Sequence, residues 1–168
     1  MPDLSARVGD ATAVLSAPNF SLTVALYRRL TAILARFAAA DPHCDPYIVE
    51  HHHARKKDAP SGTARLLAET VIAECPRKSR WAIPHAEAID PDVLSVSSVR
   101  AGTTYSSHIV GLDAPGETIE LHHSARDASP YAKGAIEAAR WLLGKKGVFS
   151  MEHVAADRLN PLFAGGRS

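Results

Sequence analysis

The sequence predicts an α+β fold, in which a single mixed, largely antiparallel sheet carries helices on one face. Strand-like and helix-like segments alternate in the first half of the chain, and three strand-like segments then follow one another before a last helix. This order, β-α-β-α-β-β-β-α, is typical of one sheet with helices packed against it. The length of 168 residues and a hydrophobic content of 46% are sufficient for one domain with a core of its own.

The first half of the chain predicts two strands and two helices. A short strand ends at Ala17-Pro18-Asn19, and Ser21 is placed to cap the helix that follows. Two Asp-Pro pairs within residues 38–46 end this helix, because a residue before proline is biased away from helical geometry. The spacing of apolar residues then sets the bounds of the predicted strands and helices. The predicted elements are a strand over Ala11–Ser16, a helix over 22–37, a strand over Tyr47–Glu50 and a helix over Thr63–Glu74.

The second half predicts three strands and one helix. Residues 75–91 are irregular, since three prolines mark loops there. Asp113-Ala114-Pro115-Gly116 is a hairpin connection between the last two strands. A short tail with a few apolar anchoring residues follows from Gly147. The predicted elements are strands over Leu94–Arg100, His108–Leu112 and Thr118–His122, and a helix over Tyr131–Leu143.

Composition narrows the classes of partner and compartment. Lys plus Arg is 19 and Asp plus Glu is 18, so the sequence implies no nucleic-acid partner. The two cysteines, Cys44 and Cys75, have no spacing typical of a zinc site or a disulfide framework, which favours a reducing cytoplasm. The start of the sequence shows no secretory signal, and no apolar run approaches a membrane span. We therefore expect a cytoplasmic protein with no membrane partner.

One segment, Glu50–Ala64, concentrates the chemistry. It contains three consecutive histidines and three cations, and it runs from the end of a strand through a Pro-Ser-Gly turn into a helix. The N–H groups at that helix N-terminus, on Gly62, Thr63 and Ala64, point out of the helix and favour a carboxylate or phosphate. Together with Lys56 and the histidines, they predict an anion pocket beside a proton donor.

Two other readings of this segment remain open from the residues alone. His51 and His53 share a strand face and could chelate a metal, although no further ligand stands at a familiar spacing. A hydrolase built on Ser61, His52 and Asp58 is also conceivable, although the Gly-x-Ser-x-Gly elbow is absent. We assign no metal ligand, and we interpret most of the remaining histidines as structural: His85, His108, His122, His123 and His153.

Four segments resemble one known family. The first, Glu50-x-His52-His53-x-x-Lys56-x-Asp58-Ala59-Pro60-Ser61-Gly62-Thr63-Ala64, resembles the signature of the dihydrodipicolinate reductases, which act in bacterial lysine (diaminopimelate) biosynthesis. Fifteen residues with this many fixed positions are far more specific than a Gly-x-Gly-x-x-Gly match. The other three agree in order and spacing: Ala17-Pro18-Asn19-Phe20-Ser21, Arg100-Ala101-Gly102 with His108 downstream, and Tyr131-Ala132-x-Gly134-Ala135.

The resemblance implies a role for each matched residue. His52 would donate or accept a proton, Lys56 would be the second proton-transfer group, and His53 with the N–H groups of Gly62 and Thr63 would bind the carboxylates of a small dicarboxylate substrate. The reaction implied is hydride transfer from NADPH or NADH to ring carbon C4 with loss of water, in a homotetramer. The residues expected to touch the nicotinamide are Ala17, Pro18, Asn19 and Phe20.

Several departures from the family pattern accompany the resemblance. Gly9 is the only glycine before Gly62, so no Gly-rich dinucleotide cradle is expected, and the cofactor-binding part would come from elsewhere, with a separate nucleotide-binding chain as one source. Residues 1–10 are interpreted as a remnant or leader, 11–160 as the substrate-binding, catalytic and oligomerisation domain, and 161–168 as a flexible tail. Family positions are altered at Thr23, Ser106, Ser107 and Ala128.

Two hypotheses of different class follow. In the first, the chain is the substrate-binding and catalytic part of a dihydrodipicolinate-type reductase that needs a cofactor domain for activity. In the second, it is a dicarboxylate-binding or oligomerisation module without redox activity. The retained His52, His53 and Lys56 favour the first hypothesis, and the absence of a Gly-rich cradle favours the second.

Overall fold

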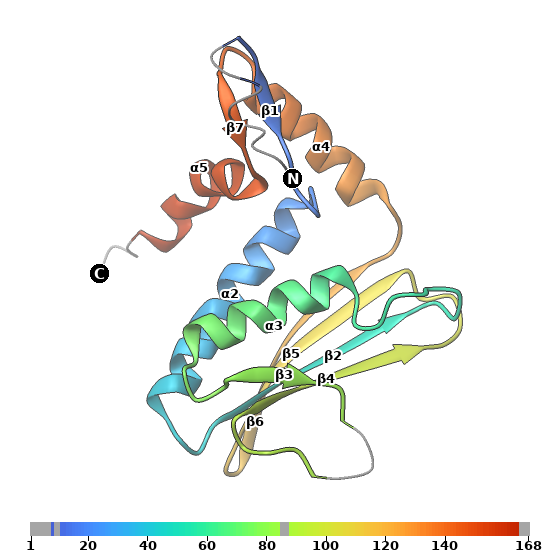
Figure 1. Cartoon of the computed structure of the whole chain (residues 1–168), viewed down its shortest axis with the longest axis vertical. Helices are drawn as coiled ribbons and strands as arrows, with labels where there is room; N and C mark the ends of the chain where they lie inside the picture. The colour runs from blue at the N-terminus through green and yellow to red at the C-terminus, as the bar shows by residue number, and fades with distance from the viewer. Residues whose placement is uncertain (1–7, 9–10, 85–87, 165–168) are drawn as a thin grey trace. The chain divides into compact units, whose positions relative to one another are not determined.

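The computed structural model describes residue 8, residues 11–84 and residues 88–164. These residues form two compact units, one of Met1–Leu26 with Ala128–Ser168 and one of Tyr27–Asp127. We refer to them as unit 1 and unit 2. Figure 1 traces the chain through both, and helix α2 (Leu22–Ala40) crosses the boundary between them.

Unit 2 is built on a five-stranded sheet with the order β3-β4-β2-β5-β6. The three strands on the β3 side pair in parallel, and β2, β5 and β6 pair antiparallel. Gly116, with a φ of 87°, occupies the left-handed position of the β5–β6 hairpin that the sequence predicts. The strands are β2 (Asp45–His52), β3 (Arg80–Ala82), β4 (Val93–Arg100), β5 (Ser106–Ala114) and β6 (Glu117–Ala125).

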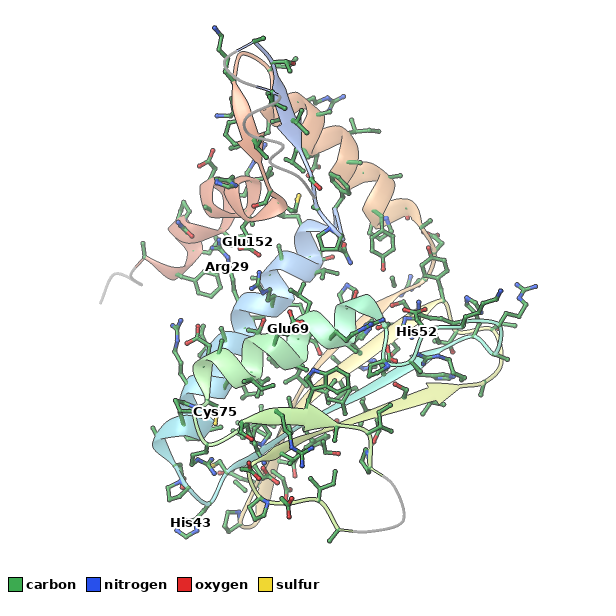
Figure 2. All side chains as sticks on the ribbon, viewed as in Figure 1. Arg29, His43, His52, Glu69, Cys75 and Glu152 are labelled. Carbon is green, nitrogen blue, oxygen red and sulfur yellow. The ribbon has the colours of Figure 1, made fainter. Side chains whose placement is uncertain are left out.

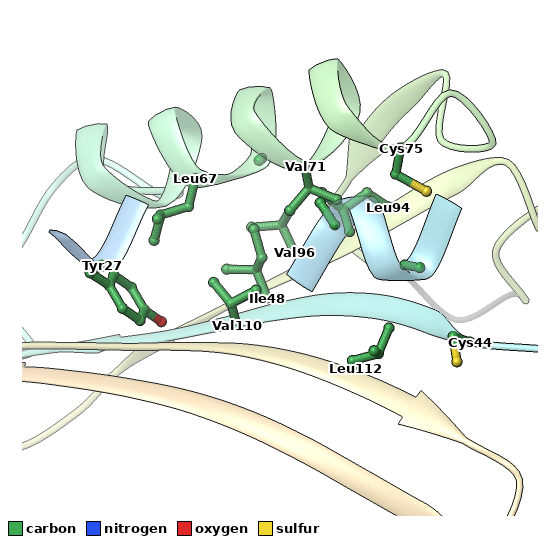
Figure 3. Packing of buried hydrophobic residues seen from close by; sticks show 13 residues of the cluster. Tyr27, Cys44, Ile48, Leu67, Val71, Cys75, Leu94, Val96, Val110 and Leu112 are labelled. Carbon is green, nitrogen blue, oxygen red and sulfur yellow. The ribbon is translucent and has the colours of Figure 1, made fainter. Parts of the chain in front are cut away.

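The core of unit 2 lies between one face of this sheet and two helices, α2 and α3 (Gly62–Glu74). Side chains of a strand alternate between faces, so β2 sends Ile48 toward the helices, and β5 sends Val110 and Leu112. Figure 3 shows these residues packed under α3, where Leu67 and its neighbours meet them. Within the described part of unit 2, no helix covers the opposite face of the sheet.

Unit 1 contains a two-stranded parallel sheet, β1 paired with β7, and two helices. Its buried residues form two small clusters, one around Ala155 and Leu159 and one around Met151 and Val154. Helix α4 approaches the backbone closely at Gly134, where an added Cβ would collide with the Phe20 carbonyl. The elements are β1 (Ala13–Leu15), α4 (Ser129–Trp141), β7 (Gly147–Phe149) and α5 (Met151–Phe163).

The predicted fold class is confirmed: the fold is α+β, with a mixed sheet and helices on one of its faces. Two details differ from the prediction. The main sheet divides evenly between parallel and antiparallel pairs, and a second, two-stranded sheet exists in addition. The domain bounds expected over 11–160 stay a prediction.

Three short or late elements were missed. Strands β3 and β7 are only three residues long, too short for an alternation pattern to register. Helix α5 lies where a tail was predicted, and it continues through residue 163, beyond the start of the expected flexible segment at 161. His85, residues 165–168 and most of the predicted leader at 1–10 lie outside the described residues.

None of the helices in the described ranges combines the length and the apolar character needed to cross a membrane.

Candidate functional site

The candidate site forms where strand β2 ends and the loop to α3 begins. The burial pattern of β2 alternates, so Glu50 and His52 continue the buried phase set by Ile48. Their partners come from β4, which is parallel to β2 and brings Ser98 and Arg100 alongside, and from β5, whose His108 is paired with Glu50. Figure 2 labels His52 beside the N-terminal end of α3.

Glu50 is the centre of this site and is fully buried. Three donors converge on its Oε1 atom: the Ser61 N–H at 2.9 Å, the Ser98 hydroxyl at 2.7 Å and the Arg100 Nη2 at 2.6 Å. These bonds tie the first residue before α3 and the end of β4 to the same carboxylate. The carboxylate therefore has a fixed orientation and a compensating cation.

The other carboxylate oxygen, Oε2, faces two imidazoles. It lies 3.3 Å from the Nδ1 of His52 and 3.6 Å from the Nε2 of His108. The two rings meet edge to face, with their centroids 5.1 Å apart. The Nε2 of His108 also shares a hydrogen bond of 3.0 Å with the Ser61 hydroxyl.

This environment changes the charge states of both groups. Burial alone would raise the pKa of Glu50, but its interactions with His108, Ser61, Arg100 and Ser98 outweigh burial and hold that pKa well below its usual range. Burial lowers the pKa of His52 to about 4, opposed by the charge of Glu50. The site thus contains a charged Glu50 and, near pH 7, a neutral His52.

The loop after His52 carries the cation that the sequence singled out. A turn closes between the Lys56 N–H and the His53 carbonyl, and the Lys56 ammonium donates to Asp58 Oδ1 at 2.7 Å. This contact lowers the pKa of Asp58. Arg100 Nη2 also donates to the Asp58 carbonyl at 2.6 Å, so the loop is fastened to the Glu50 network.

The predicted anion position lies at the N-terminus of α3, where the structure corrects one residue. Ser61 caps the helix, and its hydroxyl accepts the Ala64 N–H at 3.2 Å, so the expectation that the Ala64 N–H faces a ligand is wrong. Gly62 is exposed, and a Cβ built on it would meet nothing within 4 Å. The first turn therefore opens onto free space at Gly62, and the binding roles of Gly62 and Thr63 stay a prediction.

The hydrolase reading is not assembled as the sequence suggested. Ser61 is buried and bonds to His108 rather than His52, while Asp58 pairs with Lys56, so the proposed hydrolase triad is wrong. The ring of His51 lies 3.0 Å from the Ala101 carbonyl.

One other set of potential metal ligands meets in the site. One ligand atom each of Glu50, His52 and His108 lies within 4.8 Å of the others. The Arg100 cation, 2.6 Å from Glu50 Oε1, already balances the charge of this carboxylate. The chemistry of the set therefore fits a histidine-orienting network better than a cation site.

The predicted nicotinamide-contacting residues belong to unit 1. The side chains of Ala17 and Phe20 pack into its core, and Asn19 Oδ1 accepts the Ser21 N–H at 2.8 Å. The remaining predicted site residues, from His52 to Thr63, all belong to unit 2. The altered family positions have local partners: Thr23 Oγ1 lies 2.8 Å from Ser21 Oγ, and Ser107 Oγ lies 2.8 Å from His122 Nε2.

Three residues of this site, Glu50, Arg100 and His108, belong to the motifs found in the sequence but have no role predicted from it. His108 is interpreted there as structural. A signal for Glu50 was available, because it stands on the same strand phase as Ile48 and His52. The pairing of β2 with both β4 and β5 could not be predicted from the sequence, because strands far apart in the sequence meet only in the folded protein.

Comparisons with known proteins agree with this geometry. The family model described as "Dihydrodipicolinate reductase, C-terminus" matches residues 23–155. The 4-hydroxy-tetrahydrodipicolinate reductase of Rhodopseudomonas palustris (strain TIE-1) is 42% identical over 156 residues, which cover 88% of this chain and 56% of the relative. That of Aquifex aeolicus (strain VF5) is 40% identical over 144 residues, which cover 82% and 52%.

A solved structure shares the fold. The dipicolinate-bound dihydrodipicolinate reductase from Paenisporosarcina sp. TG-14 matches with a TM-score of 0.63 and 23% identity, over 81% of this chain and 52% of that one. The chain thus spans about half the length of the relatives it matches. Because the family model covers most of the sequence, the chain belongs to the dihydrodipicolinate reductase family, in the part that the model describes as the C-terminus.

Proposed function

We propose that this chain is the substrate-binding and proton-transferring part of a 4-hydroxy-tetrahydrodipicolinate reductase of lysine biosynthesis. The observation that carries the proposal is the buried His52, which lies on the strand that leads into a cation-bearing loop and an open helix N-terminus. A dianion bound at the helix end would place its ring among these groups. The names of the relatives support the reaction class.

The chain's own residues supply binding and proton transfer in this proposal. The N–H groups of Gly62 and Thr63 hold one carboxylate, assisted by the helix dipole. The Lys56 ammonium leaves Asp58 and pairs with the ligand instead, and His53 also contacts a carboxylate of the ligand. A nearby anion favours the charged form of an imidazole, so the bound dianion raises the pKa of His52 from about 4 toward neutrality. His52 can then pass a proton at physiological pH.

The reduction itself needs a hydride donor: a bound NADPH or NADH would supply the hydride for C4, with the hydroxyl lost as water. The sequence up to Gly62 contains only one glycine, so it offers no Gly-rich turn for a pyrophosphate. Ala17 and Phe20 are packed into the core of unit 1, and the segment could meet only the nicotinamide end. The dinucleotide is therefore assigned no main site in the described residues.

Binding of a substrate-like dianion tests the site. We expect pyridine-2,6-dicarboxylate to bind, and Lys56→Ala to weaken binding by about tenfold or more, since a charge-assisted hydrogen bond contributes roughly 1.5–3 kcal/mol. The neighbouring Lys57→Ala is the matched control, because it removes a lysine of the same loop while Lys56, the lysine that pairs with Asp58, remains. Calorimetry showing equal affinities for wild type and Lys56→Ala would reject the assignment.

Activity separates the reductase from a redox-inactive binding module. We expect the chain alone to oxidise NADPH or NADH at background rates and to gain activity when a family nucleotide-binding domain is fused ahead of residue 11 or supplied in trans. Turnover of ~1 per second or faster by the bare chain would contradict the cofactor assignment. Dianion binding without activity in any fusion would favour the binding module.

We also propose that the protein is a homotetramer, and that the uncovered face of the five-stranded sheet is part of its interface. The register places Val49, Ile109 and Val99 on that face, on neighbouring strands. A largely uncovered apolar sheet face favours association. Size-exclusion chromatography with light scattering should give a tetramer, and Val99→Arg should reduce it to a smaller species. A wild-type monomer at micromolar concentration would reject the proposal.

A further inference from the structure

Two buried polar atoms in the site face each other without a satisfactory bond. Glu50 Oε2 and His52 Nδ1 are 3.3 Å apart, and neither has a hydrogen-bond partner among the described residues. A buried polar atom left unpaired destabilises the fold. Each atom is thus the nearest hydrogen-bond partner for the other, and a small rotation of the His52 ring would complete the bond.

The rest of the network fixes which carboxylate oxygen is available. Three donors, from Ser61, Ser98 and Arg100, already occupy Oε1. They hold the carboxylate so that Oε2 must face the imidazoles. Because an ionised carboxylate only accepts hydrogen bonds, the His52 nitrogen next to it must carry the proton.

We propose that Glu50 is the positioning residue that selects the tautomer of His52: it accepts the Nδ1–H and so leaves Nε2 as the nitrogen that exchanges protons with the ligand. Glu50 is too deeply buried to touch the substrate itself, and it acts through the ring. The proposal rests on the proposed function in assigning proton exchange to His52, whereas the tautomer is a property of the free chain.

The charges around His52 come from every element that meets there. Glu50 on β2 favours the imidazolium, while Arg100 on β4, His108 on β5 and Lys56 in the loop oppose it. Glu50 is therefore the only one of these four groups that stabilises the proton on His52. Without its charge, the pKa of His52 should fall further below that of the wild type.

The substitution Glu50→Gln gives a sharp test, because the network predicts the orientation of the new amide. The three donors at the Oε1 position require the amide carbonyl there, so the NH2 group must take the Oε2 position and point at His52 Nδ1. An NH2 group donates, so Nδ1 must become an acceptor. We expect the proton of His52 to move from Nδ1 to Nε2.

The measurement is long-range ¹H–¹⁵N correlation of ¹⁵N-histidine-labelled full-length chain at pH 7.5, with a chelator and without substrate or cofactor. A His52→Gln spectrum identifies the resonances. We expect wild type to show Nδ1–H, Glu50→Gln to show Nε2–H, and the control Ser98→Ala, which removes a donor to the same carboxylate but no contact with His52, to keep Nδ1–H.

Each outcome decides the proposal. A wild-type His52 that is protonated on Nε2, or on both nitrogens, overturns it, as does a folded Glu50→Gln chain that keeps Nδ1–H. If Glu50→Gln does not fold, the wild-type spectrum and Ser98→Ala still decide. Since no ligand is present, this result is independent of whether the dianion binds or the fused enzyme is active.

Discussion

The two units of this chain differ in how completely each builds a core. Among the described residues, unit 2 buries thirteen in one cluster, under two helices on a five-stranded sheet. The described residues of unit 1 form two buried clusters of three each, beside a sheet of two short parallel strands. A two-stranded sheet is marginal by itself, and parallel strands are normally covered on both faces. We therefore expect unit 2 to be the more stable unit.

The same difference separates the chemistry. The Glu50 network, the Lys56 loop and the α3 N-terminus all belong to the unit with the larger core. A buried carboxylate and a neutral buried histidine both destabilise a fold unless rigid partners hold them. The comparison thus indicates that the proposed proton-transfer site needs the well-packed unit. The segment proposed to contact the nicotinamide, Ala17–Phe20, lies in the other unit.

The largest expected effect is on the core of unit 2. Leu67→Ala should destabilise this unit by about 2–5 kcal/mol, because the side chain is fully buried and its removal leaves a cavity. The two tryptophans separate the units, since Trp81 lies in unit 2 and Trp141 in unit 1. In a Trp141→Phe background, the fluorescence of Trp81 reports the denaturant unfolding of unit 2. The control Ile33→Ala, also in unit 2 and 48% exposed, should change stability by at most about 0.5 kcal/mol.

A second effect is acid sensitivity confined to unit 2. The pKa of His52 is about 4 in the folded state against 6.5 for the unperturbed group, so between these values the unfolded chain binds more protons. Stability should therefore fall as the pH drops from 6.5 toward 4. The depressed pKa of Glu50 causes a further loss of stability at lower pH. The lowered pKa of His123 adds to the loss that His52 causes.

The variant His52→Gln tests the source of this sensitivity. It removes the main titrating group, so its stability should change less between pH 6.5 and pH 4 than that of the wild type. Trp81 fluorescence in the Trp141→Phe background measures the change. An unaltered pH profile in the variant would assign the acid sensitivity to other groups.

The smallest expected effect is in unit 1. In Gly134→Ala the new Cβ collides with the Phe20 carbonyl, which should destabilise the unit by about 1–2 kcal/mol after the gain in helix propensity. Trp141 fluorescence in a Trp81→Phe background reports this loss. Ile136→Ala is the matched control, since it lies on the same helix and is 55% exposed. Equal stabilities for the two alanine variants would show that the close approach at Gly134 does not matter.

The sequence was most informative where patterns are long. The apolar spacing of α2 and α3 and the alternation of β2, β4, β5 and β6 predicted these elements to within a few residues. In unit 1, β7 is too short for periodicity, and the polar residues of α5 concealed its helical pattern.

For the site, the local motif predicted the loop and the helix N-terminus. The partners of Glu50 come from strands about fifty residues away, and no local pattern encodes such pairing. The chain-wide split into two units was equally invisible, because α2 runs through the boundary without a break in its pattern.

Hydrogen–deuterium exchange of the full chain, with and without pyridine-2,6-dicarboxylate, tests the central claim most directly. Without ligand, we predict the slowest exchange in β2, α3 and β5 and faster exchange in β1 and β7. With the dianion, exchange should slow in the segment from His53 to Ala64 and stay unchanged in Ala17–Phe20, while Lys56→Ala should abolish most of the change. Protection that appears mainly in unit 1, or none in the loop despite binding, would contradict the assignment of the site to unit 2.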